Sequence, residues 1–129
     1  MKVNIEYDET EFQEQIKADV EIVPRDVWSA DVTLAHIIHP VLLQIKEDKK
    51  GAPCVDNEDV PDEIRAPEVE TFEGIDVHWH NRWKYVLNEM IWAFEYAMTD
   101  SNDYVIGYKQ DRAQNGFRLF GKYYKDLWT

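Results

Sequence analysis

The segment 79–98 constrains the fold of this chain more than any other stretch. Read as a helix, it has a polar stripe formed only by Lys84, Asn88 and Glu95, which fall within roughly 40° of arc at ~100° per residue. Aromatic and aliphatic side chains cover nearly all of the remaining helix surface. A helix so apolar is central to its fold or buried in an oligomer. Because the chain offers few other elements to surround it, we expect self-association through this segment.

Two further segments have the periodicity of amphipathic helices. In 30–49, apolar residues recur at i, i+3, i+4, i+7, i+8 and i+11 from Leu34 to Ile45. Pro40 interrupts this segment and predicts a kink or a break, because proline removes one backbone hydrogen bond. In 109–127, the apolar stripe includes Gly121 at its edge, which predicts close backbone approach by a neighbouring helix or a ligand. We expect a homo-oligomer that forms through the 79–98 and 109–127 helices.

The regions outside these helices differ in composition. Residues 3–7 and 18–23 alternate between polar and apolar, which predicts a small antiparallel hairpin within 1–24. Residues 51–77 form an acidic loop, and from Glu47 to Asp76 there are eleven Asp or Glu against three Lys or Arg. One helical turn is expected near 59–65, and the rest of the loop is expected to be exposed and mobile. The sequence therefore predicts one mainly α domain over 1–129, with three principal helices, a small N-terminal β-hairpin and a long acidic loop.

The overall charge limits the classes of partner. The chain has 129 residues and a net charge of −12, so its field repels phosphates and argues against non-specific nucleic-acid or anionic-membrane binding. Cys54 is the single cysteine, which excludes an intrachain disulfide and fits a reducing cytosol. The acidic, polar N-terminus is no signal peptide, and no apolar run approaches the ~20 residues of a membrane span.

A cationic and aromatic C-terminal segment contrasts with this acidic body. Arg118, Lys122 and Lys125 follow i, i+4 and i+7 spacing and form one cationic face of the last predicted helix. Arginine makes bidentate phosphate contacts, lysine supplies a point charge, and aromatic rings stack on bases. This face predicts either a site for a small anionic ligand or an internal counterion for the acidic loop. The predicted ligand-binding residues are Arg118, Lys122, Tyr124, Asn115, Trp28, Trp83 and Arg82.

Two inward-facing carboxylates extend this hypothesis. Asp31 and Glu89 are expected to pair with Arg25, Arg82 or Arg118, as a buried ion-pair network. The alternative is that they orient these arginines toward a ligand, or bind its ribose or base.

Other candidate chemistry is weaker. The pairs His36-x-x-His39 and His78-x-His80 lack a following carboxylate motif, so surface or interface histidines are favoured over a metal site. The run 56–59 lacks the glycine and closing glutamate of a calcium loop. Cys54 has no visible activating partner, and no glycine-rich phosphate loop follows a strand. The sequence contains no complete catalytic motif, and we expect a protein without enzymatic activity, metal or cofactor.

Four stretches resemble a family of small uncharacterised tailed-bacteriophage proteins. They are Trp28-Ser29-x-Asp31-x-Thr33-Leu34-Ala35-His36-Ile37-Ile38-x-Pro40; Val55-Asp56-x-Glu58-Asp59-Val60-Pro61; Arg82-Trp83-x-x-Val86-Leu87-x-Glu89-Met90-Ile91-Trp92-Ala93-Phe94-Glu95; and Asn115-Gly116-Phe117-x-Leu119-Phe120-Gly121-Lys122-Tyr123-Tyr124. The resemblance covers most of residues 24–128. It implies a viral origin and expression inside the host bacterial cytoplasm, and it carries no activity with it.

These observations support two functional hypotheses. In the first, a phage-encoded binding protein sequesters a nucleotide-type host immune signal as an anti-defence factor. Arg118 and Lys122 would hold phosphate. Trp28, Trp83 or Tyr124 would stack on a base, and Asn115 would form hydrogen bonds with polar edges of the ligand. In the second, the acidic chain mimics nucleic acid, or acts as an adaptor, and inhibits a basic host or phage protein. The second hypothesis assigns the contacts to the loop carboxylates Asp56, Glu58, Asp59, Asp62 and Glu63.

Overall fold

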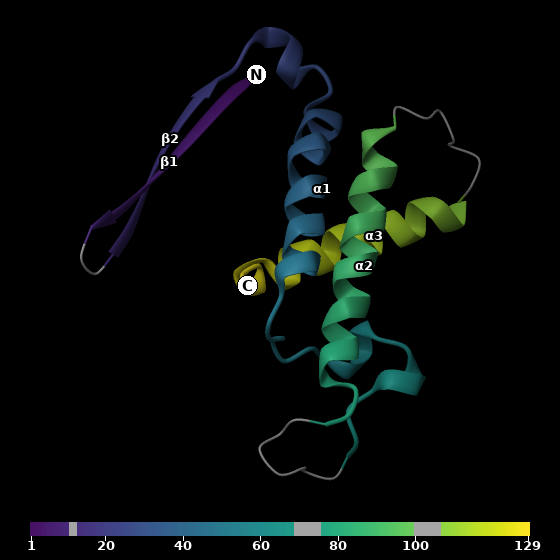
Figure 1. Cartoon of the computed structure of the whole chain (residues 1–129). Helices are drawn as coiled ribbons and strands as arrows, with labels where there is room; N and C mark the ends of the chain where they lie inside the picture. The colour runs from purple at the N-terminus through teal and green to yellow at the C-terminus, as the bar shows by residue number, and fades with distance from the viewer. Residues whose placement is uncertain (11–12, 69–75, 100–106) are drawn as a thin grey trace.

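A helical body and a projecting hairpin make up the chain. The computed structural model describes residues 1–10, 13–68, 76–99 and 107–129. The body contains α1 (Ala30–Asp48), α2 (Trp79–Met98) and α3 (Gly107–Lys122), while β1 (Lys2–Thr10) and β2 (Gln13–Glu21) form the antiparallel hairpin. Helices α1 and α2 lie side by side with opposite chain directions, and α3 crosses them (Figure 1). The predicted fold class, mainly helical with an N-terminal hairpin and an acidic loop, is confirmed.

Helix α2 is the centre of the body. It packs against both α1 and α3, and its buried residues include Trp83, Val86, Leu87 and Met90. Burying each such side chain contributes about 2 kcal/mol relative to leaving it exposed. The expectation that too few elements surround this helix is wrong, because the loop after α1 adds the buried residues Val55 and Val60 to the same core. The apolarity of α2 is thus satisfied within one chain and no longer argues for an oligomer.

The loop after α1 is more ordered than its composition predicts. It forms short 3-10 turns at Asn57–Asp59 (η2) and Asp62–Ile64 (η3), which matches the helical turn expected near 59–65. The expectation of exposure outside the turn at 59–65 is wrong for Val55, which is buried, and within the turn Asp59 and Val60 are buried as well. Residues 69–75 of the predicted loop lie outside the described residues. The loop is held to the body because it carries apolar side chains between its carboxylates.

A glycine allows α3 to cross closely over α2. A Cβ added at Gly116 would lie 2.6 Å from the carbonyl oxygen of Glu89 and would also collide with the side chain of Ala93. Gly121, for which the sequence predicts such an approach, has nothing within 4 Å of an added Cβ. That prediction is wrong by five residues, because the crossing point falls earlier on the helix. Beyond it, Phe94 packs edge-on against Phe117 and Phe120.

Helix α1 is continuous, and only part of its apolar stripe is buried. It runs through Pro40 without a break, so of the predicted kink or break, the break does not occur. Pro40 and His36, whose carbonyl lacks its helical donor, are both exposed, and water can satisfy that carbonyl. Ala35, Leu42 and Ile45 face the core. Further apolar residues of this helix stay exposed, namely Leu34, Ile37, Val41 and Leu43.

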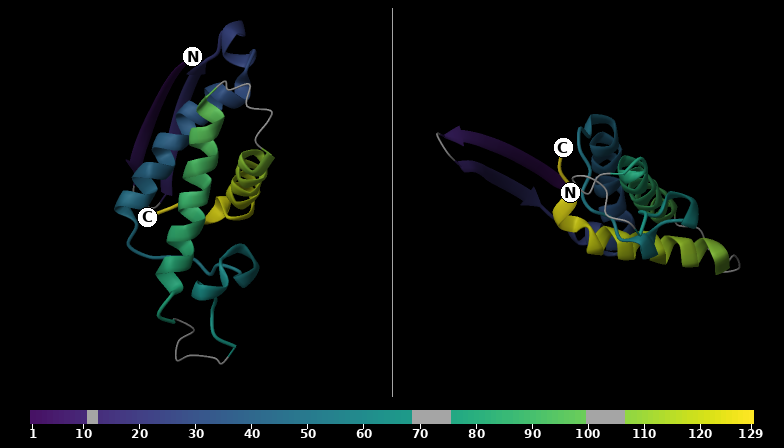
Figure 2. Two further views of the ribbon diagram at one scale, coloured as in Figure 1. Left: turned by 90° about the vertical axis from the view of Figure 1, so that its right-hand side faces the viewer. Right: turned by 90° about the horizontal axis from the view of Figure 1, so that it is seen from below.

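The hairpin, called the arm from here on, is amphipathic and stands away from the helices (Figures 1 and 2). Its register places Val3 opposite Val20, Ile5 opposite Ala18, and Tyr7 opposite Ile16. Because side chains alternate along a strand, these six residues share one face. The other face carries the pairs Lys2–Glu21, Asn4–Asp19 and Glu6–Lys17. All twelve residues are exposed, so neither face of the arm is covered.

Asp26 fixes the base of the arm. It belongs to the 3-10 turn η1 (Pro24–Val27), which follows β2. Its Oδ1 accepts a hydrogen bond of 3.0 Å from the Met1 ammonium group, and its Oδ2 accepts one of 2.8 Å from the Val23 backbone N–H. The Val23 bond and the Met1 ammonium lower the pKa of Asp26. Both ends of the hairpin are therefore tied to the turn that leads into α1.

Candidate functional site

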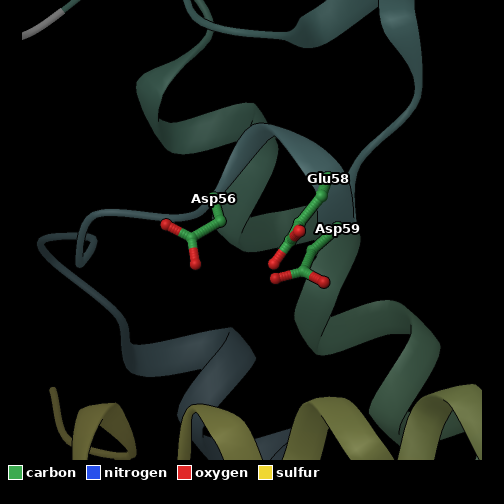
Figure 3. Close-up of side chains that lie close together, drawn as sticks. All are labelled: Asp56, Glu58 and Asp59. Atoms are coloured by element: carbon green, nitrogen blue, oxygen red, sulfur yellow. The ribbon is translucent and has the colours of Figure 1, made fainter.

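The predicted cationic face binds the acidic loop of its own chain. The Arg118 Nη2 donates a hydrogen bond of 2.7 Å to Asp59 Oδ1. The Lys122 Nζ lies 2.8 Å from Asp56 Oδ2, 3.0 Å from Glu58 Oε1 and 2.7 Å from Asp59 Oδ2. Figure 3 shows these three carboxylates converging above α3. We call this group the clasp; its members are Asp56, Glu58, Asp59, Arg118, Lys122 and Tyr123.

Asp59 and Tyr123 form the buried centre of the clasp. The Tyr123 hydroxyl donates a bond of 2.6 Å to Asp59 Oδ2 and accepts one of 3.0 Å from the Asp56 backbone N–H. The Asp59 side chain is 0% exposed. Burial opposes its ionisation, yet Lys122, Tyr123 and Arg118 outweigh burial and hold the pKa of Asp59 below its usual value. Burial and the Asp59 carboxylate together raise the pKa of Tyr123 to about 12.

The Lys122 ammonium occupies the position that a metal ion would take. Asp56, Glu58 and Asp59 are the one carboxylate or histidine group in the described ranges with three potential ligand atoms close enough to share an ion. Their oxygens instead surround the Lys122 Nζ, and these contacts raise the pKa of Lys122. A divalent cation would have to displace this ammonium group. In this structure the three carboxylates therefore bind the lysine side chain.

The contacts of Arg118 and Lys122 match the prediction that the cationic face is an internal counterion for the acidic loop. Asn115 is also engaged, because its Oδ1 accepts bonds of 3.0 and 2.9 Å from the Nε and Nη2 of Arg118. A phosphate group at this position would compete with Asp59 for Arg118, and with three carboxylates for Lys122. Such a competition lowers affinity, because the ligand must pay for breaking charge-assisted hydrogen bonds.

Arg82 and Trp83 lie in the interior. Arg82 is 2% exposed and forms a two-point ion pair with Asp76, with N–O distances of 2.9 and 2.6 Å. This hydrogen bonding lowers the pKa of Asp76 to about 2. Trp83 is 1% exposed and meets Tyr123 edge-on at 5.9 Å between ring centroids. In this conformation neither residue is accessible to a ligand, and Trp83 supports the clasp by packing against Tyr123.

The predicted partners of the two inward carboxylates are also wrong. Glu89 is buried, as expected, but it accepts bonds of 2.9 and 3.0 Å from Arg112. Asp31 is exposed near the start of α1, and no ion pair involves it among the described side chains. The helical period predicted the inward position of Glu89 correctly but did not identify Arg112 as its partner, and the prediction that Asp31 faces inward is wrong.

Trp28 and Tyr124 are exposed, but they do not join the clasp. Trp28 precedes α1 at the base of the arm, is 73% exposed, and lies under the guanidinium of Arg25 at 4.7 Å from the ring centroid. Tyr124 lies just beyond α3 and lines an apolar groove of about 360 Å³ between α1 and the C-terminal segment. We call this the α1–α3 groove; its residues are Ile37, Ile38, Val41, Leu42, Ile45, Phe120, Tyr124 and Leu127. The seven predicted ligand residues therefore do not form one site.

A second hollow does not suit an anion. It has a volume of about 500 Å³ and lies where the start of α1 meets α2 and α3. Asp31 and Asp111 line it together with Gln110 and Gln114, and no lysine or arginine is among its described lining residues. The negative charge of the two carboxylates opposes a phosphate ligand there.

The arm is acidic, and its described side chains are exposed. Residues 2–21 contain seven carboxylates and two cations, Lys2 and Lys17. Glu6, Asp19 and Glu21 are exposed and form no ion pair among the described side chains. By contrast, four of the five loop carboxylates that the second hypothesis selects form ion pairs, namely Asp56, Glu58, Asp59 and Asp62.

Sequence reasoning missed four residues that organise the interior: Asp59 as a buried anion, Tyr123 as its donor, Asp76 as the partner of Arg82, and Arg112 as the partner of Glu89. One usable signal was present, since Asp59 lies directly before Val60, whose burial draws the loop toward the core. The other pairings depend on tertiary contacts between residues far apart in the chain, for which periodicity gives no information.

Comparison with known proteins yields no family assignment. No family model matches the chain, and neither the curated proteins nor the solved structures include a match. Among the described residues, no helix combines the length and the apolarity that a membrane crossing requires.

Proposed function

We propose that this chain is a non-enzymatic acidic adaptor that binds a basic protein partner through the carboxylates of its arm. One observation carries the proposal: Arg82, Arg112, Arg118 and Lys122 pair with carboxylates of the body, whereas the arm has seven carboxylates against two cations between residues 2 and 21. Arg118 and Lys122, the predicted phosphate-binding residues, are occupied by carboxylates. Glu6, Asp19 and Glu21 are exposed and unpaired among the described side chains, and they lie on a projecting element.

Electrostatics gives this proposal a defined mode of action. A concentration of negative charge on an exposed element steers a cationic partner toward it and speeds association, in a manner that salt suppresses. The polar face of the arm presents Glu6, Asp19 and Glu21, and an extended hairpin can lie in a groove on the partner. If that groove normally binds nucleic acid, the arm acts as a mimic and blocks it.

The predicted viral origin defines the biological setting of the proposal. A phage protein of this kind would act in the host bacterial cytoplasm on a basic host or phage protein. Inhibiting a defence protein in this way would serve the same anti-defence purpose as sequestering its signal, and it needs no small-molecule pocket.

The small-anion hypothesis is the second candidate. One observation favours it, since the Arg118 side chain is 48% exposed and lies beside Asn115. A nucleotide-type ligand bound there would have to open the clasp. Native mass spectrometry of the purified protein with a nucleotide-rich extract of infected cells would detect such a ligand as a discrete added mass, which Arg118→Ala would abolish.

Two variants of equal charge test the adaptor proposal. The arm variant is Glu6→Gln with Asp19→Asn and Glu21→Gln. The control variant is Glu47→Gln with Glu63→Gln and Glu68→Gln, which removes three exposed carboxylates from the body. Each immobilised protein is exposed to a bacterial extract, the captured proteins are identified by mass spectrometry, and the affinity for the enriched basic partner is measured at several salt concentrations.

We expect the arm variant to weaken that affinity by at least about tenfold, or about 1.4 kcal/mol. The control should bind like the unmodified protein, and salt should weaken binding throughout. Equal losses of affinity in both variants would show that only net charge matters. The proposal would be contradicted if the unmodified protein captured no basic protein more strongly than the arm variant does.

A further inference from the structure

Two apolar surfaces of this chain remain uncovered, and they lie on different elements. One is the apolar face of the arm, formed by Val3, Ile5 and Tyr7 of β1 with Ile16, Ala18 and Val20 of β2. The other is the α1–α3 groove. We propose that two copies of the chain exchange arms, so that the apolar face of each arm lies in the α1–α3 groove of the other copy.

The arm needs a surface to pack against. Its large apolar side chains are 48% to 61% exposed, at Val3, Ile5, Tyr7, Ile16 and Val20. A two-stranded hairpin is marginally stable in water on its own, and a covered apolar face is what usually stabilises it. Contiguous apolar surface of this kind is characteristic of a protein–protein contact. Leaving it bare forgoes the hydrophobic stabilisation that burial would provide.

The groove offers a surface of matching character. All eight residues that line it are apolar or aromatic, and Ile37, Val41 and Tyr124 on its rim are exposed. The α1 residues that line the groove run from Ile37 to Ile45, which is eight residue steps, or about 12 Å at ~1.5 Å per residue. The apolar pairs of the arm extend over four steps of strand, or about 13 Å at ~3.3 Å per residue, before side chains are added. The two surfaces are therefore of similar length.

The occupant of the groove is a second copy because the arm is held away from its own body. Asp26 binds both the Met1 ammonium group and the Val23 backbone N–H, which fixes the direction in which the hairpin leaves η1. The arm extends on the same side of α1 as the C-terminal segment that lines the groove, yet it stands clear of the helices (Figures 1 and 2). An arm so placed can reach across to a neighbouring molecule.

Reciprocal exchange accounts for both surfaces at once. In a twofold dimer each contact is made twice, and both arms and both grooves are filled. The polar face of each arm remains outward in this arrangement. Because each copy carries a net charge of −12, repulsion opposes association, and added salt should strengthen the dimer by screening it.

The mass of the particle tests the inference. Size-exclusion chromatography with light scattering, run over a wide range of protein concentration, should find a species of twice the 15.3 kDa of one chain. Ile5→Glu in the arm and Val41→Glu in the groove should each weaken dimerisation by at least about tenfold, because each would place a charge in an apolar contact. Both positions are exposed in the single chain, so folding of the body should survive, as circular dichroism can verify.

Matched controls separate the contact from the added charge. Asn4→Glu adds the same charge to the opposite face of the arm. Leu43→Glu adds it to α1 at an exposed apolar position that does not line the groove. Both control variants should dimerise like the unmodified chain.

Mixing the two disruptive variants provides the sharpest test. An Ile5→Glu chain has an intact groove and a Val41→Glu chain has an intact arm, so the mixture should recover a heterodimer with one intact contact. If Val41→Glu alone still dimerised, the dimer would form by arm-to-arm pairing and the inference would be wrong. A single chain at every concentration and salt would overturn it outright.

The inference does not rest on the proposed adaptor function, and the two fail separately. If no basic partner binds, the mass of the dimer is unchanged. If the dimer does not form, capture of a basic partner by Glu6, Asp19 and Glu21 can still be measured on the monomer. Salt acts with opposite sign on the two events, since it strengthens the dimer and weakens binding of a basic protein.

Discussion

The helical body and the arm of this chain are both built from amphipathic elements, but only the body covers its apolar faces. In the body, the apolar faces of α2 and α3 meet each other, and the buried charges Asp59, Arg82 and Glu89 all have partners. In the arm, an equally regular apolar face has no cover in the chain. The difference shows that alternation predicts which residues share a face, but not what covers that face. The following predictions test this contrast, beginning with the largest expected effect.

Breaking the clasp should cost the body the most. Asp59→Ala removes the fully buried carboxylate that holds Lys122, Arg118 and Tyr123. Removing one partner of a buried ion pair costs about 3–5 kcal/mol, and we expect about 3 kcal/mol here because Arg118 is partly solvated. Chemical denaturation measures the loss in the free energy of unfolding. Glu58→Ala is the matched control; its side chain is 75% exposed and should cost less than about 0.5 kcal/mol. Equal losses would contradict the burial argument.

Filling the crossing of α2 and α3 should have the next largest effect. Gly116→Ala should lower the free energy of unfolding by about 1–3 kcal/mol, because the added Cβ meets the Glu89 carbonyl oxygen. Gly121→Ala is a control on the same helix with open space around it, and it should be neutral or stabilising by up to about 1 kcal/mol. Thermal unfolding of the two variants gives the comparison. A stabilising Gly116→Ala would show that the helices separate easily at this point.

The sequence predicted the elements of the fold well and their contacts poorly. The three helices, the hairpin and the 3-10 turn near 62–64 follow from local periodicity and turn residues, which act over a few positions. The burial of Val55, Asp59 and Val60 did not follow, because the high charge of the loop masks the two valines that anchor it. Gly121 was preferred to Gly116 because both lie on or near the apolar stripe, and only the crossing point distinguishes them.

The candidate site shows the same difference between local spacing, which the sequence predicts, and tertiary contacts, which it does not. Arg118 and Lys122 were correctly grouped on one helix face, because i, i+4 spacing is local, whereas Lys125, predicted on the same face, lies beyond α3 in the 3-10 turn Tyr124–Asp126. Trp28, Trp83, Tyr124 and Arg82 were added by residue type alone, and the structure places them in three other environments. That the counterions of the cationic face come from residues 56–59, about sixty positions away, is a tertiary fact that no spacing rule contains.

Raising the pH should weaken the body through the clasp. The pKa of Tyr123 is raised from 10.0 to about 12, so the stability it contributes is complete below the unfolded pKa and is lost as the pH rises toward the folded one. We expect a loss of about 1 kcal/mol between about pH 9 and pH 11 from this group, and Lys122, whose pKa is also raised, acts in the same direction. Denaturation at a series of pH values measures it.

Tyr123→Phe is the variant that isolates this effect. It should be less stable at neutral pH, because Asp59 loses a donor, and its stability should fall less steeply above pH 10. An identical alkaline slope in the variant would assign the loss to other groups.

Changing the arm should affect the body least. In dilute solution, where single chains predominate, Ile5→Glu should change the free energy of unfolding of the helical body by less than about 0.5 kcal/mol. The reason is that Ile5 is exposed and packs against no helix core residue. The helical circular dichroism signal, which comes from α1, α2 and α3, follows the body during denaturant unfolding. A large loss would show that the arm is part of the cooperative unit.

Amide hydrogen exchange followed by mass spectrometry tests the contrast between arm and body most directly. It should be recorded at low and high protein concentration for the unmodified chain and for Val41→Glu. We predict that amides of α2 are protected in all four samples, whereas those of β1 and β2 become protected only in the concentrated unmodified chain. Arm amides that are equally protected at both concentrations and in Val41→Glu would contradict the account, because the hairpin would then be stable without a partner.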